Sequence, residues 1–155
     1  MIVGVETSIE GVFLTQLDII DVPRGEVLHA MKKNDCGYVG FGEAYFSRIA
    51  SGAVKAWKKH KLMTLNLVVC SGSVKFVVYD NRAVSPSCGS FYEATLSHEN
   101  YCRLTVPPMV WMGFQGVGDE TSMLLNIADL AHCSEELDRL DISEINYDWR
   151  VGLSK

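Results

Sequence analysis

A basic run near the middle of the chain carries the side chains with the most evident chemistry. Its members are Lys55, Lys58, Lys59, His60 and Lys61. A cation enclosed in a protein needs water or an anion as a partner. An amine or imidazole that burial and neighbouring cations keep neutral can instead accept a proton as a general base. Lys58 and His60 are two residues apart and therefore share one face of a strand, which makes them the candidate catalytic residues.

Exposed strand edges often carry lysines that discourage aggregation, and this interpretation fits Lys59 and Lys61. The basic run therefore predicts one of two arrangements. Either Lys58 lines a pocket that binds an anion, or the lysines all lie in solvent at an exposed strand edge.

The elements that position this run are predicted to be β-strands. The pattern of residues 52–82 predicts a strand with several polar residues, an apolar strand, a Ser-Gly turn and a further apolar strand. Other strands are expected at residues 43–49, 91–96, 101–106, 110–115 and 121–127, with entry strands in residues 1–20 and a strand or short helix after the turn at 21–25. Only residues 134–140 have helical spacing and a plausible cap. We therefore expect an all-β, jelly-roll barrel with little helix, in a single domain over residues 1–155.

Charge and cysteine usage exclude several classes of protein. The net charge is -5 and the pI about 5.3, which argues against bulk binding of nucleic acid. Five cysteines without a C-x-x-C pair indicate neither a disulfide framework nor a thiolate zinc site. No signal peptide and no apolar run of about 20 residues is found. We expect a cytoplasmic protein with no membrane partner.

Glycine spacing around the basic run resembles the first motif of cupin barrels, G-x5-H-x-H-x4-E-x6-G. Residues 52–72 reproduce this frame, but Lys58 and Leu65 stand where a histidine and the glutamate would bind a metal. Residues 107–112 resemble the second motif, P-x-G-x2-H, with Met112 in place of its histidine. An ammonium, a leucine and a thioether do not make a site for a divalent metal. We therefore expect no bound metal and no cofactor.

Six short segments, in order and register over roughly residues 10 to 149, resemble the dTDP-4-dehydrorhamnose 3,5-epimerase family. They are Pro23-Arg24-Gly25, Val54-Lys55-Ala56-Trp57, Tyr79-Asp80-Asn81-Arg82 with Ser85-Pro86, Leu96-Ser97-His98-Glu99-Asn100, Val106-Pro107-Pro108, and Gly113-Phe114. The resemblance implies a cupin jelly roll, a homodimer, and a nucleotide-diphosphate sugar as substrate. It also implies epimerisation of a 4-keto-6-deoxy sugar in surface-polysaccharide or deoxysugar biosynthesis.

The resemblance assigns roles residue by residue. The family's phosphate-contacting basic residues fall on Arg24 and Lys55, which keep the positive charge that a diphosphate requires. Its general base, a histidine, falls on Lys58, and the histidine of its H-G-F motif falls on Met112. Its tyrosine acid falls near Leu125. The acidic partner in a later W-N-D motif has no clear counterpart before Tyr147-Asp148-Trp149. Three chemical positions therefore differ from the family's pattern.

The remaining candidates are substrate-binding residues. Tyr45 and Trp111 offer rings for stacking on a base or sugar face. Glu43, Asn66 and Arg103 are polar residues on otherwise apolar strands and so could hydrogen-bond a ligand. A salt bridge to Glu99 is the structural alternative for Arg103, and Glu43 is a possible carboxylate partner for the amine of Lys58.

Three functions fit these observations. The first is an epimerase or isomerase that removes a proton next to a ketone, without metal, through Lys58 or His60. The second is a cupin that binds a nucleotide sugar without epimerising it. The third is a sugar 3,4-ketoisomerase, which shares the enediol chemistry but moves the carbonyl.

Overall fold

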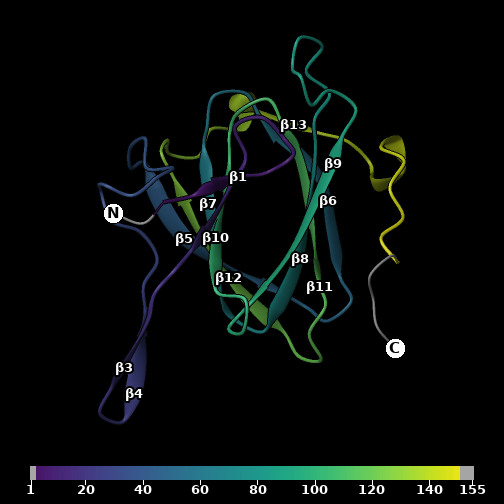
Figure 1. The fold of residues 1–155 in the computed structure, drawn as a ribbon. Coiled ribbons are helices and arrows are strands. Elements are labelled where there is room, and N and C mark those ends of the chain that lie inside the picture. Colours follow the sequence, from purple (N-terminus) through teal and green to yellow (C-terminus); the bar gives the residue numbers. More distant parts are fainter. Residues whose placement is uncertain (1–2, 151–155) are drawn as a thin grey trace.

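Two antiparallel sheets face each other and form a barrel in the computed structural model, which describes residues 3–150 (Figure 1). The first sheet has the order β1 (Val5–Glu6), β2 (Phe13–Gln16), β10 (Cys102–Val106), β7 (Leu65–Ser71), β12 (Ser122–Ala128) and β5 (Glu43–Ile49). The second has the order β13 (Leu137–Arg139), β6 (Val54–His60), β11 (Trp111–Gly116), β8 (Ser73–Tyr79) and β9 (Phe91–Ser97). A hairpin of β3 (Ile19–Val22) and β4 (Gly25–Leu28) projects away from the barrel (Figure 1).

The core lies between the inner faces of the two sheets. Alternate residues of the strands point inward, as in β12, where Leu124 is fully buried. Leu67, Leu104 and Phe76 join it from β7, β10 and β8. The all-β prediction is confirmed, and the strands expected from residue 43 to residue 127 are present with ends that differ by one or two residues.

A second apolar cluster covers the outer face of the five-stranded sheet. The segment after β13, with a short 3-10 turn η2 (Ile142–Glu144), packs Trp149 against Trp57 of β6 with ring centroids 5.2 Å apart. Trp111 of β11 belongs to the same cluster. The outward side chains of β6 and β11 are therefore occupied by packing, and their inward side chains are left for the barrel.

The helix expected at residues 134–140 is wrong. Residues Ser134–Glu136 form one 3-10 turn, η1, and residues 137–139 continue as β13, which pairs with the end of β6. The Glu136 carboxylate is buried and accepts hydrogen bonds from the backbone N–H groups of Lys61, Leu62 and Met63. These bonds hold the chain against β6, so tertiary contacts override the local helical spacing.

One segment of the resemblance, residues 79–86, has a structural role. Asp80 is fully buried and accepts hydrogen bonds from the Arg82 guanidinium and from the hydroxyls of Ser85 and Ser87. Arg82 first, and the two hydroxyls with it, hold the pKa of the Asp80 carboxyl well below its usual range. This cluster fixes the loop between β8 and β9. Among residues 3–150 no helix has the length and apolar character needed to cross a membrane.

Candidate functional site

An irregularity in β6 places two lysines on the inner face of the barrel. Lys58 pairs with Met112 of β11, and Lys55 pairs with Phe114, so three steps on β6 match two steps on β11. The extra residue is a β-bulge, and it brings Lys55 to the face that Lys58 already occupies. The Ala56–Trp57 peptide bond within this bulge is cis.

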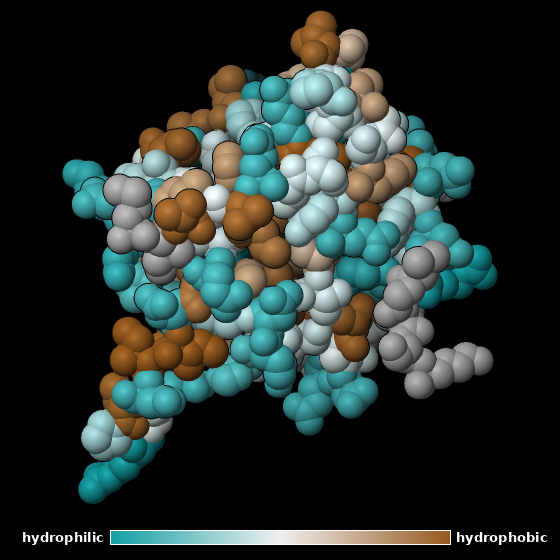
Figure 2. Space-filling view, in the orientation of Figure 1, coloured by the Kyte–Doolittle hydropathy of each residue, from teal (hydrophilic) through white to brown (hydrophobic). Residues whose placement is uncertain are grey.

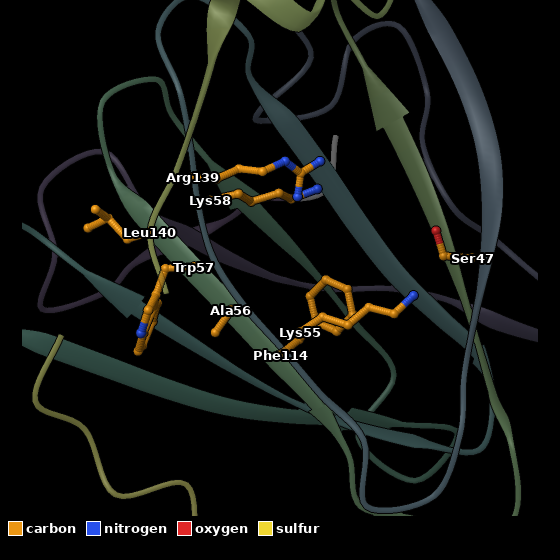
Figure 3. Close-up of a pocket in the computed structure, with 8 residues that line it drawn as sticks. All are labelled: Ser47, Lys55, Ala56, Trp57, Lys58, Phe114, Arg139 and Leu140. Atoms are coloured by element: carbon orange, nitrogen blue, oxygen red, sulfur yellow. The ribbon is translucent and has the colours of Figure 1, made fainter. Parts of the chain in front are cut away.

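Lys55 and Lys58 line a cavity of about 420 Å³. Its wall is made by Ser47, Lys55, Ala56, Trp57, Lys58, Phe114, Arg139 and Leu140. Figure 3 shows that the side chains of Lys58 and Arg139 run side by side, while the amine of Lys55 reaches toward Ser47 on the opposite sheet. The lining contains three cations and no carboxylate. Such a cavity favours an anionic ligand, because a cleft lined by one sign of charge attracts ions of the opposite sign.

The surroundings of Lys58 affect the protonation of its amine. Burial first, and then the neighbouring charges of Arg139 and Lys55, lower the pKa of its amine from the ordinary value. Glu136 acts in the opposite direction and only partly offsets them. Glu43, the expected carboxylate partner, is not among the groups that act on Lys58. The amine therefore holds its proton less firmly than a lysine in water.

His60 lies on the same strand face as Lys58 but outside the lining of the cavity. It is 9% exposed, and its Nδ1 forms a short hydrogen bond with the Glu136 carboxylate. Burial lowers the pKa of His60, even though Glu136 raises it. The neutral ring therefore donates from Nδ1 to Glu136, and Nε2 is buried without a partner. Through its bond to Glu136, His60 helps to hold β13 and Lys58 in position. His60 itself lies outside the set of residues that line the cavity.

On the opposite wall, β5 presents Ser47, Tyr45 and Glu43 at alternating positions of one face. Ser47 lines the cavity, and Tyr45 lies directly opposite the buried Asn126 of β12. Burial and the Glu43 carboxylate raise the pKa of Tyr45. Tyr45 and Glu43 therefore lie on β5, the strand that borders the cavity at Ser47. Both residues precede Ser47 in that strand.

Three expected binding residues have other partners. Arg103 is fully buried, and its guanidinium binds Asp35 together with the carbonyls of Ala30 and Cys36. Its ion pair is with Asp35 and not with Glu99.

Asn66 bonds the Gly37 carbonyl and accepts from Thr105. Trp111 packs on the outer face of β11, with the Lys59 amine 4.7 Å from its ring centroid. The structure thus assigns Arg103 and Asn66 to anchoring residues 30–37, and Trp111 to the outer cluster, because each faces away from the barrel interior.

Arg24 lies at the turn of the β3–β4 hairpin, exposed and with a φ of 70°. The hairpin extends away from the barrel, so Arg24 is remote from the cavity of its own chain (Figure 1).

The strand faces show where Met112 and Leu125, two positions named by the resemblance, lie in the barrel. Met112 is buried in the core beside Lys58. Leu125 packs with Leu17 and Val68 on the outer face of the six-stranded sheet, and Asn126 is the next side chain of β12 that faces inward. Leu125 therefore faces away from the barrel interior.

Arg139, Ser47 and Phe114 belong to the lining and were not predicted from the sequence as site residues. Phe114 lies in the Gly113-Phe114 pair of the resemblance, which was a usable signal. For Arg139 the sequence held no such signal, since it predicted a helix over residues 134–140. In the part of the chain that the structure describes, no three His, Cys, Asp or Glu side chains gather in a group that could hold a metal.

The fold and the site define this protein as a jelly-roll β-barrel with a cavity whose lining carries three cations. Comparison with known proteins gives the family. The chain belongs to the dTDP-4-dehydrorhamnose 3,5-epimerase family, whose sequence model matches residues 6–155.

Similar proteins agree with this assignment. A dTDP sugar isomerase from Desulfovibrio desulfuricans G20 is 36% identical, with a TM-score of 0.90 over 95% of this chain and 96% of that one. Agl13 of Haloferax volcanii, a probable low-salt glycan biosynthesis epimerase, is 32% identical over 115 residues, which cover 71% of this chain and 74% of Agl13. The cupin-type jelly roll is confirmed, and so is the expected function class of nucleotide-sugar epimerase.

A more distant structure shows the same fold. It is a 3,5-epimerase from Legionella pneumophila, in complex with dTDP-4-keto-L-rhamnose. It is 19% identical, with a TM-score of 0.81 over 92% of this chain and 79% of that one.

Proposed function

We propose that this protein epimerises a nucleotide-diphosphate 4-keto-6-deoxy sugar with Lys58 as the base, in place of the family's histidine. The observation that carries the proposal is the position of Lys58, inside the cavity and beside two other cations. A lysine near its ordinary pKa of 10.5 is a poor base at neutral pH, and the lowered pKa of Lys58 improves it.

The chemistry follows from the acidity of a C–H next to a ketone. The Lys58 amine removes this proton, the C–H electron pair moves toward the carbonyl oxygen, and an enolate forms. Lys55 and Arg139 supply positive charge to the same cavity, which stabilises the enolate oxygen and the diphosphate. Return of a proton from water to the opposite face of the carbon gives the epimer.

Proton NMR in deuterium oxide tests this function. The protein is incubated with dTDP-, CDP- and GDP-linked 4-keto-6-deoxy sugars, and we expect deuterium to appear at C3 or C5 of at least one of them. Product analysis identifies a 3,4-ketoisomerase, which would move the carbonyl. The absence of deuterium at both carbons in every sugar would contradict the epimerase proposal.

A binding protein without turnover is the second candidate function. The specific observation in its favour is that Met112 and Leu125 provide no acid or base where the resemblance has them. In that case Lys58 remains protonated and binds phosphate. Calorimetry would then show binding of the nucleotide sugar, while the NMR experiment would show no exchange.

We further propose that the protein is a homodimer in which the β3–β4 hairpin contacts a second copy. Figure 2 shows apolar side chains gathered on this projecting hairpin. They are Ile20, Val22 and Val27, which are 47%, 41% and 46% exposed. Apolar surface of this kind is commonly covered by a partner. A second copy would also give Arg24 a route to a cavity, since its own cavity is out of reach.

Light scattering at micromolar concentration measures this assembly. We expect twice the mass of the 17.2 kDa chain. Ile20→Ser combined with Val27→Ser should shift the protein toward monomer, because less apolar area would be buried. A wild-type protein that is monomeric at this concentration would rule the dimer out.

A further inference from the structure

We propose that Arg139 is a functional residue of the cavity, a fixed cation that disfavours the protonated form of the Lys58 amine so that it serves as the base. This inference rests on the proposed function, and it concerns a residue whose role follows only from the tertiary structure.

The geometry places Arg139 directly beside Lys58. The two residues are paired across β13 and β6, and their side chains run parallel into the cavity (Figure 3). Side chains directly opposite in an antiparallel pair lie close together, and like charges there destabilise each other. The cost is lower when one of the two is less readily protonated. Arginine is always protonated, so the lysine is the partner whose protonated form is disfavoured.

Other charged or titratable groups near Lys58 lie on β6 and just before β13. On β6 itself the charged or titratable neighbours are Lys55 and His60. On the other side of β6, β11 presents Met112, and across the cavity β5 presents Ser47, neither of which carries a charge. Glu136, just before β13, is the one acid that acts on Lys58.

Glu136 does not cancel the effect of Arg139, because its effect on Lys58 is smaller than that of Arg139 or of Lys55. One oxygen of Glu136 bonds His60, and the other accepts from three backbone N–H groups. Lys58 therefore has two cationic neighbours whose effect outweighs that of Glu136. Of the two cations, Arg139 has the larger effect.

The role in the reaction is consistent with proton balance. A neutral Lys58 amine accepts the proton from the carbon next to the ketone and becomes an ammonium, while the electron pair of the C–H bond passes to the carbonyl oxygen. Arg139 disfavours the ammonium and favours the enolate oxygen. It therefore promotes both release of the proton to water and formation of the enolate.

The test is a pH titration of Lys58 by NMR. The side-chain Cε resonance of Lys58 is assigned by its absence in Lys58→Met. The titration is repeated in Arg139→Gln, which removes the charge, and in Arg139→Lys, which keeps it. Arg150→Gln is the matched control, because Arg150 pairs with Asp148 and its side chain is 88% exposed.

We expect the titration midpoint of Lys58 to rise in Arg139→Gln and to stay near the wild-type value in Arg139→Lys and Arg150→Gln. Deuterium exchange at pH 7 should fall on the order of tenfold in Arg139→Gln, since one pKa unit changes the neutral fraction by that factor. Raising the pH should restore it. A merely structural role would not produce this pH-dependent recovery.

An unchanged midpoint in Arg139→Gln overturns the inference. If that variant does not fold, the wild-type protein gives the answer, because Arg139 is exposed and salt screens its charge. The Lys58 midpoint should then rise with salt, and a constant midpoint overturns the inference. A midpoint that rises in Arg139→Gln supports it even if no sugar is turned over, a result that would count against the proposed function alone.

Discussion

Replacing Lys58 with methionine should abolish deuterium exchange at the sugar carbon next to the ketone. Methionine has a similar length and fits the wall beside Met112, so the barrel should be retained. Loss of a positioned general base typically costs 10²–10⁴-fold, so we expect a fall of about 10³-fold in the exchange rate. NMR in deuterium oxide measures the rate, and calorimetry measures binding of the nucleotide sugar.

Lys61→Met is the matched control for this variant. Lys61 lies just beyond β6, and its side chain is 45% exposed in an ion pair with Asp138. It should exchange at the wild-type rate. If Lys58→Met keeps its exchange rate and loses phosphate affinity instead, Lys58 is an anion-binding residue and the binding function is the correct one. Lys58→His should restore exchange only in part, because β12 provides no tyrosine at Leu125.

Replacing Glu136 with glutamine should destabilise the protein by about 3 kcal/mol, as expected when a buried charged acceptor of several hydrogen bonds is removed. The carboxylate accepts from His60 and from three successive backbone N–H groups, whereas the amide would turn an N–H₂ group toward some of these donors. Urea unfolding measures the loss. We also expect faster amide hydrogen exchange at Leu62 and Met63, since these N–H groups lose their acceptor, whereas the Lys61 N–H keeps its bond to the Glu136 carbonyl.

Glu135→Gln is the control, because Glu135 is the exposed neighbour of Glu136. Its stability should remain within about 0.5 kcal/mol of the wild type. A Glu136→Gln variant as stable as Glu135→Gln would show that the carboxylate does not hold β13 on β6.

The same carboxylate gives a pH dependence of stability. Burial alone would raise the pKa of Glu136, but the hydrogen bonds from His60 and the backbone hold it below its ordinary value of 4.5. Its contribution is therefore fully present above pH 4.5 and is lost as the pH falls through the lowered folded-state pKa. The difference between wild type and Glu136→Gln should shrink in this acid range.

The sequence by itself determined the all-β class of the fold and the strand face on which Lys58 lies. Alternation of apolar and polar residues, and turns at glycine and proline, located the strands from residue 43 to residue 127. The same alternation placed Lys58 on the face opposite Trp57 and Lys59, both of which pack outward in the structure. Periodicity is a local property, so a single chain is enough to read it.

Only the tertiary structure decided which polar residues meet. Arg103 and Asn66 were candidates because they interrupt apolar strands, yet each bonds the loop of residues 30–37, which folds over the outer face of the sheet. Nothing in the strand pattern distinguishes a polar side chain that anchors a loop from one that binds a ligand.

The cationic cavity was decided in the same way. The bulge in β6 brings Lys55 to the inner face, and the long-range bonds of Glu136 convert an expected helix into β13, which places Arg139 opposite Lys58. These contacts join residues more than 50 positions apart in the chain. Local propensity does not register interactions over such separations, because their free energy is gained only when the two sheets have closed.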